Sequence, residues 1–307
     1  MPKLSVVVPV YYNAESLPPL FEKLQAVERQ LHQLGLDLEL IFVDDGSGDA
    51  SFQALQAIKA QRPATRLVKL SRNFGAMRAC KAGAQFVTGD CFSFLAADLQ
   101  DPPELLVEMA ARWQQGAKFV LCTRAERDDP LLSRLWAALY YRLLRLLVLP
   151  SFPPGGYDLA LMDQALLPHL LQSGRTAHLQ VSLFWLGFRP EIIAYKRLKR
   201  EHGRSHWSFA KRLTASLDVL LGFSVVPIRL ISLLGLGVSL ASFSYGAVVI
   251  VAALMGIRPV PGFASLAALI SFLLGLIIVM LGVIGEYLWR IFEEVNHRPE
   301  AVIDEVL

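Results

Sequence analysis

Apolar and polar residues alternate in blocks along the first 122 residues, in a pattern typical of an α/β protein. Apolar runs at residues 4–10 and 38–43 predict buried strands, and apolar positions recur at helical spacing from Leu17 to Leu34. Because strands that alternate with helices form parallel sheets with right-handed crossovers, the pattern predicts a parallel α/β sheet. The predicted strands are 4–10, 38–43, 66–70, 91–96 and 117–122, and the predicted helices are 17–34, 51–60, 76–87 and 104–115.

Two long apolar runs follow Pro227. Neither contains a charged residue, and about 20 apolar residues suffice to cross a hydrocarbon core of about 30 Å. The runs predict two transmembrane helices at about 230–255 and 261–285, within a membrane segment at 227–290. Cationic residues flank the outer ends of this pair, whereas Arg258 alone lies between the runs. By the positive-inside rule, the preceding domain and the tail at 291–307 lie on the cytoplasmic side of the membrane.

Two further segments mix cationic, aromatic and aliphatic side chains. Residues 131–149 and 207–226 have the composition of helices that lie flat on a bilayer, and a core-facing amphipathic helix is the alternative for each. The predicted cytoplasmic domain spans residues 1–206 and includes the first of these segments. Small residues in the apolar runs allow close helix packing between subunits and leave a homo-oligomer open. They are Gly235, Gly237, Gly275 and Gly282.

Composition agrees with a chain that is partly embedded in a membrane. The 307 residues are 54% hydrophobic and 19% charged, and the mean hydropathy is +0.42. A formal net charge of +3 gives no indication of nucleic-acid binding. The spacing of Cys80, Cys91 and Cys122 fits neither a disulfide framework nor a zinc site, so we interpret them as buried thiols. The first residues lack the features of a cleaved signal peptide, which favours a first domain that stays where it is made.

Polar clusters follow four of the predicted strands. Asp, Asn and Gly are ordinary turn residues, but the carboxyl ends of parallel strands meet at one sheet edge, where ligands bind. Neither GxGxxG nor GxxxxGK follows the first strand. Carboxylates in place of glycine loops favour a ligand whose phosphates are neutralised by Mg²⁺ or Mn²⁺, and a nucleotide-diphosphate sugar is the natural candidate. The clusters are at residues 9–13, 44–49, 71–75 and 98–101.

Four motifs, in order and spacing, closely resemble glycosyltransferase family 2. They are Val-Val-Val-Pro-Val-Tyr at 6–11, Phe-Val-Asp-Asp-Gly-Ser at 42–47, Leu-Ser-Arg-Asn-Phe-Gly at 70–75 and Ala-Asp-Leu-Gln-Asp-Pro-Pro-Glu at 97–104. Within the family, the match is to polyprenyl-phosphate glycosyltransferases, the group of dolichol-phosphate mannose synthase and bacterial undecaprenyl-phosphate glucosyltransferases. The resemblance continues through residues 157–163, 200–208 and the paired apolar runs, and covers nearly the whole chain.

The resemblance implies a GT-A fold, the Rossmann-like α/β fold of nucleotide-diphospho-sugar transferases, followed by a two-helix transmembrane hairpin. It implies inverting transfer of one sugar from a nucleotide-diphosphate sugar, UDP-glucose being the first choice, to undecaprenyl phosphate. The reaction would take place at the cytoplasmic face of the inner membrane, among membrane lipid. Its lipid-linked product would serve modification of a cell-envelope glycan such as lipopolysaccharide.

The resemblance also implies residue roles. Asp98 and Asp158 are expected at the reacting centre, and Asp98 and Gln100 would bind Mg²⁺ or Mn²⁺. A phosphate monoester has a second pKa of about 6, so the acceptor hardly needs a general base, and Asp158 is left open as a base or a positioning group. The residues expected to bind the nucleotide sugar are Pro9, Tyr11, Asp44, Asp45, Arg72 and Asp98, and those expected to bind donor or acceptor phosphates are Arg124, Ser133, Arg200 and Ser205.

Three positions depart from the family pattern. Ala96 stands where the family has an additional aspartate, Tyr12 where it has asparagine, and Ala160 where it has arginine. Without this aspartate, two alternatives are open: metal binding is weaker, or it is lost. The alternative function is therefore a membrane-anchored pseudoenzyme or scaffold that binds nucleotide sugars. A processive polysaccharide synthase would need a Gln-x-x-Arg-Trp motif and more spans, which the sequence lacks.

Overall fold

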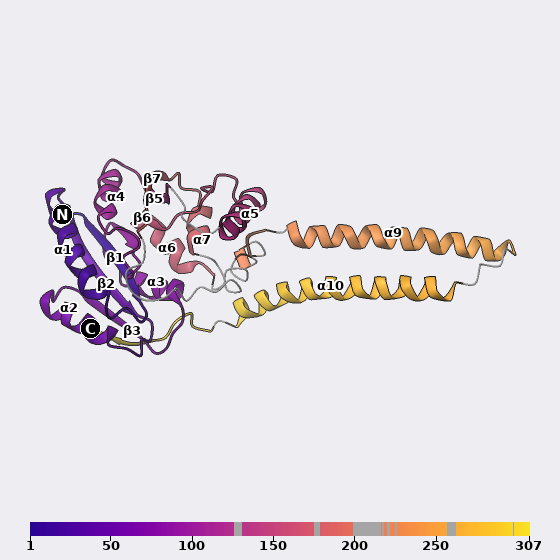
Figure 1. Cartoon of the computed structure of the whole chain (residues 1–307), viewed down its shortest axis with the longest axis horizontal. Coiled ribbons are helices and arrows are strands. Elements are labelled where there is room, and N and C mark those ends of the chain that lie inside the picture. The colour runs from indigo at the N-terminus through magenta and orange to yellow at the C-terminus, as the bar shows by residue number, and fades with distance from the viewer. Residues whose placement is uncertain are drawn as a thin grey trace. The chain divides into compact units, whose positions relative to one another are not determined.

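The computed structural model describes residues 1–125, 131–174, 179–198, 216, 218–219, 222–224, 226–256, 262–296 and 298–307 (Figure 1). The chain divides into two compact units. The first comprises Met1–Val219 together with Arg298–Leu307, and the second comprises Leu220–His297.

The described part of the first unit is built on one eight-stranded mixed sheet, with strand order β7-β5-β6-β4-β1-β2-β3-β8. The strands are β1 (Lys3–Val10), β2 (Asp37–Asp44), β3 (Arg66–Leu70), β4 (Cys91–Phe94), β5 (Phe119–Arg124), β6 (Leu159–Asp163), β7 (Glu191–Tyr195) and β8 (Ile303–Val306). The helices are α1 (Leu17–Gln33), α2 (Ser51–Gln61), α3 (Ala76–Ala84), α4 (Leu105–Gln114), α5 (Leu131–Leu147), α6 (Leu167–Gln172) and α7 (Leu179–Trp185), and η1 (Gln164–Leu166) is a 3-10 turn.

All five predicted strands and all four predicted helices are confirmed, with ends that shift by a few residues. The five predicted strands run parallel to one another, as predicted: β1 pairs parallel with β2 and β4, β2 pairs parallel with β3, and β5 has the same direction as β4 because both are antiparallel to β6. The sequence pattern did not predict β6. Strand β6 lies between β4 and β5 and runs antiparallel to both. Helix α5 precedes β6 in the chain, but the sequence analysis assigned segment 131–149 to a helix on the membrane surface or in the core and predicted no strand after it.

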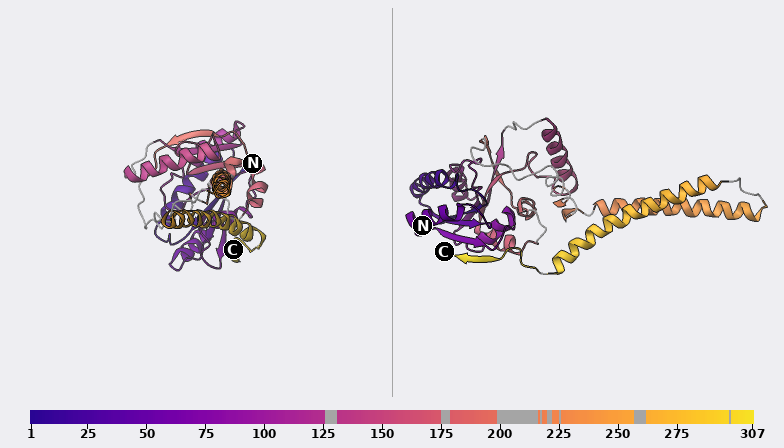
Figure 2. Two further views of the ribbon diagram at one scale, coloured as in Figure 1. Left: turned by 90° about the vertical axis from the view of Figure 1, so that its right-hand side faces the viewer. Right: turned by 60° about the horizontal axis from the view of Figure 1, so that its bottom comes forward.

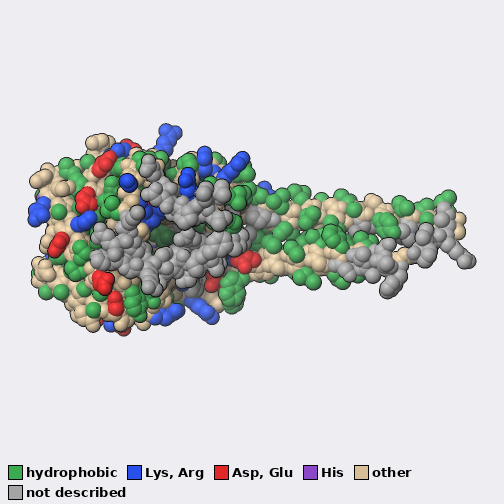
Figure 3. Space-filling view, viewed as in Figure 1, with side chains coloured by type: hydrophobic (Ala, Val, Ile, Leu, Met, Phe, Trp, Pro, Cys, Tyr) green, Lys and Arg blue, Asp and Glu red, His purple; other side chains and the backbone are tan. Residues whose placement is uncertain are grey.

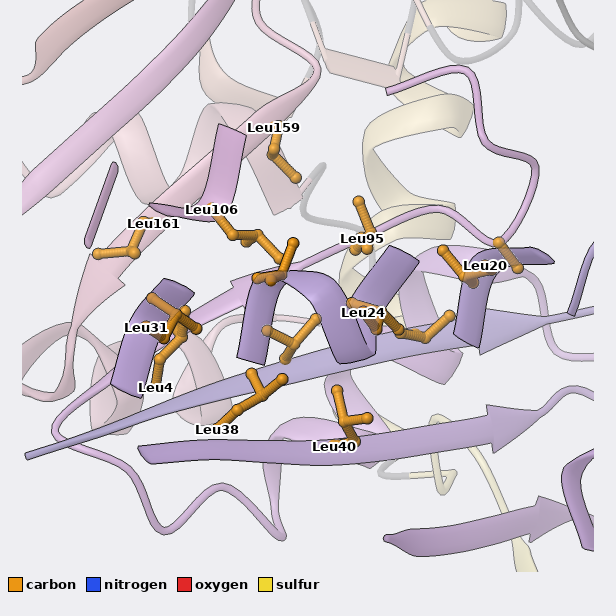
Figure 4. Close-up of a cluster of buried hydrophobic side chains, with 14 of the residues drawn as sticks. Leu4, Leu20, Leu24, Leu31, Leu38, Leu40, Leu95, Leu106, Leu159 and Leu161 are labelled. Atoms are coloured by element: carbon orange, nitrogen blue, oxygen red, sulfur yellow. The ribbon is translucent and has the colours of Figure 1, made fainter. Parts of the chain in front are cut away.

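Helix α1 covers one face of the sheet with a leucine stripe. Leu20, Leu24 and Leu31 recur at helical spacing and are fully buried, against Leu4 of β1 and Leu40 of β2 among others (Figure 4). Burying one such side chain contributes about 1.5–3 kcal/mol. This apolar layer fixes the positions of β1 and β2. The loops that follow their carboxyl ends therefore begin at defined positions.

Helix α3 packs on the opposite face. A Cβ added at Gly83 would lie 2.5 Å from Val7 Cγ1 and 2.7 Å from Val43 Cγ2, so only glycine lets α3 approach β1 and β2 this closely. Cys80 on α3 is buried, as are Cys91 and Cys122, and all three are free thiols, which confirms the prediction for them. Burial raises the pKa of Cys80 to about 12, so this thiol is inert.

The end of the chain forms β8, an edge strand that the sequence pattern did not predict (Figure 2). It pairs antiparallel with β3, with Val68 opposite Val306. Just beyond β3, the Ser71 amide donates to Val302 O at 2.9 Å. Lys81 Nζ lies 2.6 Å from Glu300 Oε1 and binds the same terminal segment to α3. Strand β8 is short and carries two acidic residues, which explains why its apolar signal is weak.

The second unit contains two long apolar helices, α9 (Val226–Leu254) and α10 (Phe263–Val295). Within them, Ile228–Val248 and Phe272–Glu293 are long and apolar enough to cross a membrane. Many large apolar side chains of both helices are exposed, and on the face seen in Figure 3 they are mixed with small and polar residues. These helices lie where the two membrane spans were predicted, and α10 continues ten residues past the predicted end at 285.

Two side-chain details of the second unit concern its apolar helices, and the first bears on the predicted helix packing. A Cβ added at Gly235 would lie 2.6 Å from Met280 Cε, so this glycine of α9 faces α10 of the same chain. Glu286 pairs with Arg290 one turn later at 3.2 Å.

Segment 131–149 is helical as α5, and whether it lies on a membrane stays a prediction. Most of segment 207–226 lies outside the described residues.

Candidate active site

The carboxyl ends of β1, β2 and β3 form the first part of the site. Val10 pairs with Asp44, so the loops after β1 and β2 leave the sheet side by side. The Asp45 amide donates to Val10 O at 2.8 Å. Asp45 is buried, and its carboxylate accepts hydrogen bonds from the Phe74 amide at 2.7 Å and the Gly75 amide at 2.9 Å. Asp45 therefore holds the loop after β3 against the end of β2.

Asp44 is fully buried and has one oxygen without a partner. Its Oδ1 accepts from the Ser47 amide at 3.3 Å, whereas Oδ2 is buried and has no hydrogen-bond partner among the described residues. Burial raises the pKa of Asp44. Leaving a buried polar atom unsatisfied costs about 1–3 kcal/mol. A ligand that donates a hydrogen bond from a base N–H or a ribose hydroxyl would remove this cost, which agrees with the role predicted for Asp44.

Close backbone contacts join the three loops. Gly46 has φ +69°, and a Cβ there would lie 2.5 Å from the carbonyl carbon of Arg72, so only glycine fits. Tyr12 adopts φ +55°, and its amide donates to Ser47 Oγ at 3.2 Å. Asn13 accepts from the Tyr11 amide through Oδ1 at 3.0 Å. The fold thus brings Pro9, Tyr11, Asp44, Asp45 and Arg72 to one edge of the sheet, as predicted.

The loop after β4 holds the predicted metal ligands. Asp98 is half-buried, and its Oδ1 accepts from the Gln100 amide at 3.2 Å. Leu99, between them, is buried with φ +59°, a left-handed conformation that costs a non-glycine residue about 1–3 kcal/mol. Ala96 supplies no side-chain oxygen here. Within the described ranges, no three His, Cys, Asp or Glu side chains gather as a metal site.

This donor set nevertheless fits Mg²⁺ or Mn²⁺ that is held mainly by a substrate. Mg²⁺ keeps several waters and is commonly bound by one or two carboxylates together with substrate phosphates. Asp98 offers one carboxylate and Gln100 one amide oxygen, both on a loop beside the predicted nucleotide edge. Metal binding is therefore expected to depend on the diphosphate.

A second polar cluster adjoins this loop. It lies at the same sheet edge because β5 and β7 run parallel to each other and β6 begins where they end. Asp158 receives a two-pronged hydrogen bond from Arg124, with Nε to Oδ2 and Nη2 to Oδ1 both at 2.6 Å. The Tyr195 hydroxyl donates to Asp101 Oδ1 and lies 3.1 Å from Asp158 Oδ2. Arg197 Nε is 3.3 Å from Asp101 Oδ1.

The charges in this cluster determine the protonation of its carboxylates. Burial favours the neutral form of Asp158, but the hydrogen bonds and charge of Arg124, with the charge of Arg197, hold its pKa below the usual range. Burial raises the pKa of Asp101, against the opposing charge of Arg197. Asp158 is therefore a carboxylate whose two oxygens are already engaged, which suits it poorly to accept a proton.

Some predicted site residues cannot be placed. Arg200 and Ser205 lie outside the described residues, as does the side chain of Ser133, whose backbone is in the first turn of α5. Arg124, predicted to bind a phosphate, is paired with Asp158. Sequence reasoning missed the partnership of Asp101, Tyr195 and Arg197. Asp101 belongs to a recognised motif, but nothing local in the sequence indicates its partners.

The sheet topology and the acidic strand ends together define a GT-A-like fold, the fold of nucleotide-sugar transferases. In M. tuberculosis glucosyl-3-phosphoglycerate synthase, solved with Mn²⁺, UDP-glucose and phosphoglyceric acid, the fold is similar at a TM-score of 0.51 and 18% identity, over 72% of this chain and 78% of that one. The chain belongs to glycosyl transferase family 2, whose model matches residues 5–171. It is therefore a glycosyltransferase.

Relatives match along the whole chain. The bactoprenol glucosyl transferase of Shigella phage SfV is 33% identical over 98% of this chain and 98% of its own length. A prophage bactoprenol glucosyl transferase homolog of Escherichia coli K12 is 31% identical over 99% of both.

Proposed function

We propose that the protein transfers glucose from UDP-glucose to undecaprenyl phosphate, with inversion at the sugar carbon. The observation that carries this proposal is the match to the Shigella phage bactoprenol glucosyl transferase over 98% of both chains. A match of this extent includes the apolar helices as well as the glycosyltransferase domain. The word glucosyl in the relatives' names supports glucose, and the word bactoprenol supports a polyprenol acceptor.

The donor would lie across the ends of β1, β2 and β4. Asp44 Oδ2 is the buried acceptor for a hydrogen bond from the nucleoside, and the loop held by Asp45 carries Arg72 beside it. Asp98 and Gln100 would hold Mg²⁺ or Mn²⁺, which when bound neutralises the diphosphate and stabilises it as a leaving group. The solved protein of the same fold contains Mn²⁺.

The acceptor phosphate would attack the sugar directly. A phosphate oxygen forms a bond to C1 of glucose while the bond from C1 to the diphosphate oxygen breaks, and its electron pair leaves with UDP. Because a phosphate monoester has a second pKa of about 6, the attacking oxygen is already ionised at neutral pH. The low pKa of Asp158 and its engagement with Arg124 favour a positioning role over a general base.

The membrane setting follows from the same proposal. The two apolar helices would span the inner membrane as a hairpin, with the glycosyltransferase domain and the C-terminus in the cytoplasm, as the cationic flanks indicate. Arg200 and Ser205, in the basic stretch before the first span, would receive the acceptor phosphate. The glucosylated lipid would then supply a step that modifies a cell-envelope glycan.

The test is a donor panel in detergent. Purified protein is given undecaprenyl phosphate and one labelled UDP- or GDP-sugar at a time, with Mg²⁺, with Mn²⁺ or with EDTA, and label entering the lipid phase is counted. We expect transfer from UDP-glucose in the presence of metal. Transfer from another sugar alone would overturn the donor assignment. Transfer that survives full chelation would overturn the metal role of Asp98 and Gln100.

A further inference from the structure

We propose that Tyr195 and Arg197 are positioning residues that fix the loop 98–101 in the conformation that holds the metal and the donor diphosphate. This inference rests on the proposed function, because it concerns the same loop. The two residues lie on the segment 195–198, which begins with the last residue of the edge strand β7 and continues beyond it. They are far from the loop in sequence.

The segment contacts the loop at three points. The Leu198 amide donates to Gln100 O at 2.9 Å. The Tyr195 hydroxyl donates to Asp101, and Arg197 Nε lies 3.3 Å from the same carboxylate. One backbone hydrogen bond to Gln100 and two side-chain contacts to Asp101 thus hold the two residues that follow Leu99.

The segment is itself held in place from the other side. The Ala125 amide donates to Tyr195 O at 2.9 Å, directly after β5. The Tyr195 hydroxyl also lies 3.1 Å from Asp158 Oδ2, so it stands between two carboxylates. Arg124 and Arg197 supply the positive charge that keeps these carboxylates together. Residues at the ends of β5 and β7, together with Asp158 just before β6, therefore hold the segment 195–198, and through it the loop 98–101, in place.

The loop needs such support because its backbone is strained. Leu99 is buried at φ +59°, and a conformation of this kind persists only where its surroundings over-determine it. Asp98 and Gln100 stand on either side of Leu99, so relaxation of its backbone would change the separation of the two proposed metal ligands. One local hydrogen bond spans Leu99, from the Gln100 amide to Asp98 Oδ1 at 3.2 Å, and the contacts from segment 195–198 add long-range support to it.

The test compares Tyr195→Phe with Tyr287→Phe. Both changes remove one hydroxyl and keep the ring, but Tyr287 donates to Ser224 O in the second unit. The full-length protein in detergent is titrated with UDP by calorimetry, with Mn²⁺ and with EDTA. We expect Tyr195→Phe to weaken UDP binding about tenfold in Mn²⁺, with little change in EDTA. We expect Tyr287→Phe to leave both affinities unchanged.

Arg197→Gln is a second test of the same inference, because it keeps a polar side chain at this position and removes the positive charge. It too should weaken UDP binding in Mn²⁺ and spare binding in EDTA. Equal losses in Mn²⁺ and EDTA, or a lowered melting temperature with unchanged UDP binding, would assign the two residues to general stability and overturn the inference. If the unaltered protein binds no UDP in either condition, the proposed function fails as well, so the two failures are distinguishable.

Discussion

Replacing Asp45 by asparagine tests whether its buried carboxylate holds the loop after β3. The carboxylate accepts from the Phe74 amide at 2.7 Å and the Gly75 amide at 2.9 Å. Hydrogen bonds to a charged group contribute about 1.5–3 kcal/mol each, and a neutral one about 0.5–1.5 kcal/mol. Asparagine has one acceptor oxygen, so one bond becomes neutral and the other amide faces an NH₂ group.

The expected loss in the free energy of unfolding follows from these values and from the burial of Asp45. Burial raises the pKa of Asp45, so its charged form carries a desolvation cost that asparagine does not share. We therefore expect a loss at the lower end of the range, about 2 kcal/mol. For a unit of this size, that loss lowers the melting temperature by about 4–8 °C.

Thermal unfolding in detergent measures this loss, and hydrogen exchange of the peptide spanning residues 71–75 locates it. Asp49→Asn is the matched control, since Asp49 also accepts from a backbone amide, that of Ser51 at 3.1 Å, and asparagine can replace it there. We expect only Asp45→Asn to unfold earlier and to exchange faster at Phe74 and Gly75. Equal melting temperatures and equal exchange in the two variants would refute the role given to Asp45.

Three further changes test other parts of the site and the edge of the sheet. The pKa of Asp158 lies below its ordinary value near 3.8, so the stability it contributes is present above that pH and is lost as the pH falls through the lower folded pKa. Melting temperatures measured from about pH 5 down to about pH 2 should therefore fall less steeply for Asp158→Asn, and an unchanged slope would contradict the ion pair. In the same variant, the pH–rate profile should keep the inflection of the acceptor phosphate at about 6, whereas its loss would restore Asp158 as a base. Asp98→Asn should raise the Mn²⁺ concentration needed for half-maximal UDP binding by about tenfold, and an unchanged requirement would place the metal elsewhere. Deletion of residues 302–307 removes the strand paired with β3 and should speed hydrogen exchange in β3, while protection equal to that of the full chain would show that β8 is dispensable.

Local patterns predicted the part of the fold in which strand and helix alternate. The strand 66–70 was predicted with its observed ends, because an apolar run is bounded there by turn residues. Strand β6 has a similar apolar run, but its antiparallel place between β4 and β5 depends on long-range pairing. Strand β8 follows the apolar helices and pairs with β3 across more than two hundred residues.

The candidate site likewise has a part that could be predicted from the sequence and a part that could not. Pro9, Asp44 and Arg72 were placed together because parallel strands share their carboxyl edge, which is a consequence of topology. The bond from Tyr195 to Asp101 joins residues 94 positions apart, and no local spacing encodes it. The pairing of Arg124 with Asp158 was likewise missed: Arg124 was expected to bind a phosphate, and Asp158 was expected at the reacting centre as a base or a positioning group.

The configuration of the lipid product tests the central claim most directly. Protein incubated with undecaprenyl phosphate, UDP-glucose and Mn²⁺ is extracted with organic solvent, and the lipid is examined by mass spectrometry and proton NMR. The α-linked sugar of UDP-glucose, transferred with one inversion, should appear as a single β-linked glucosyl phosphate on the polyprenol. An α-linked product, more than one sugar per lipid, or an unglucosylated lipid after complete incubation would contradict the account.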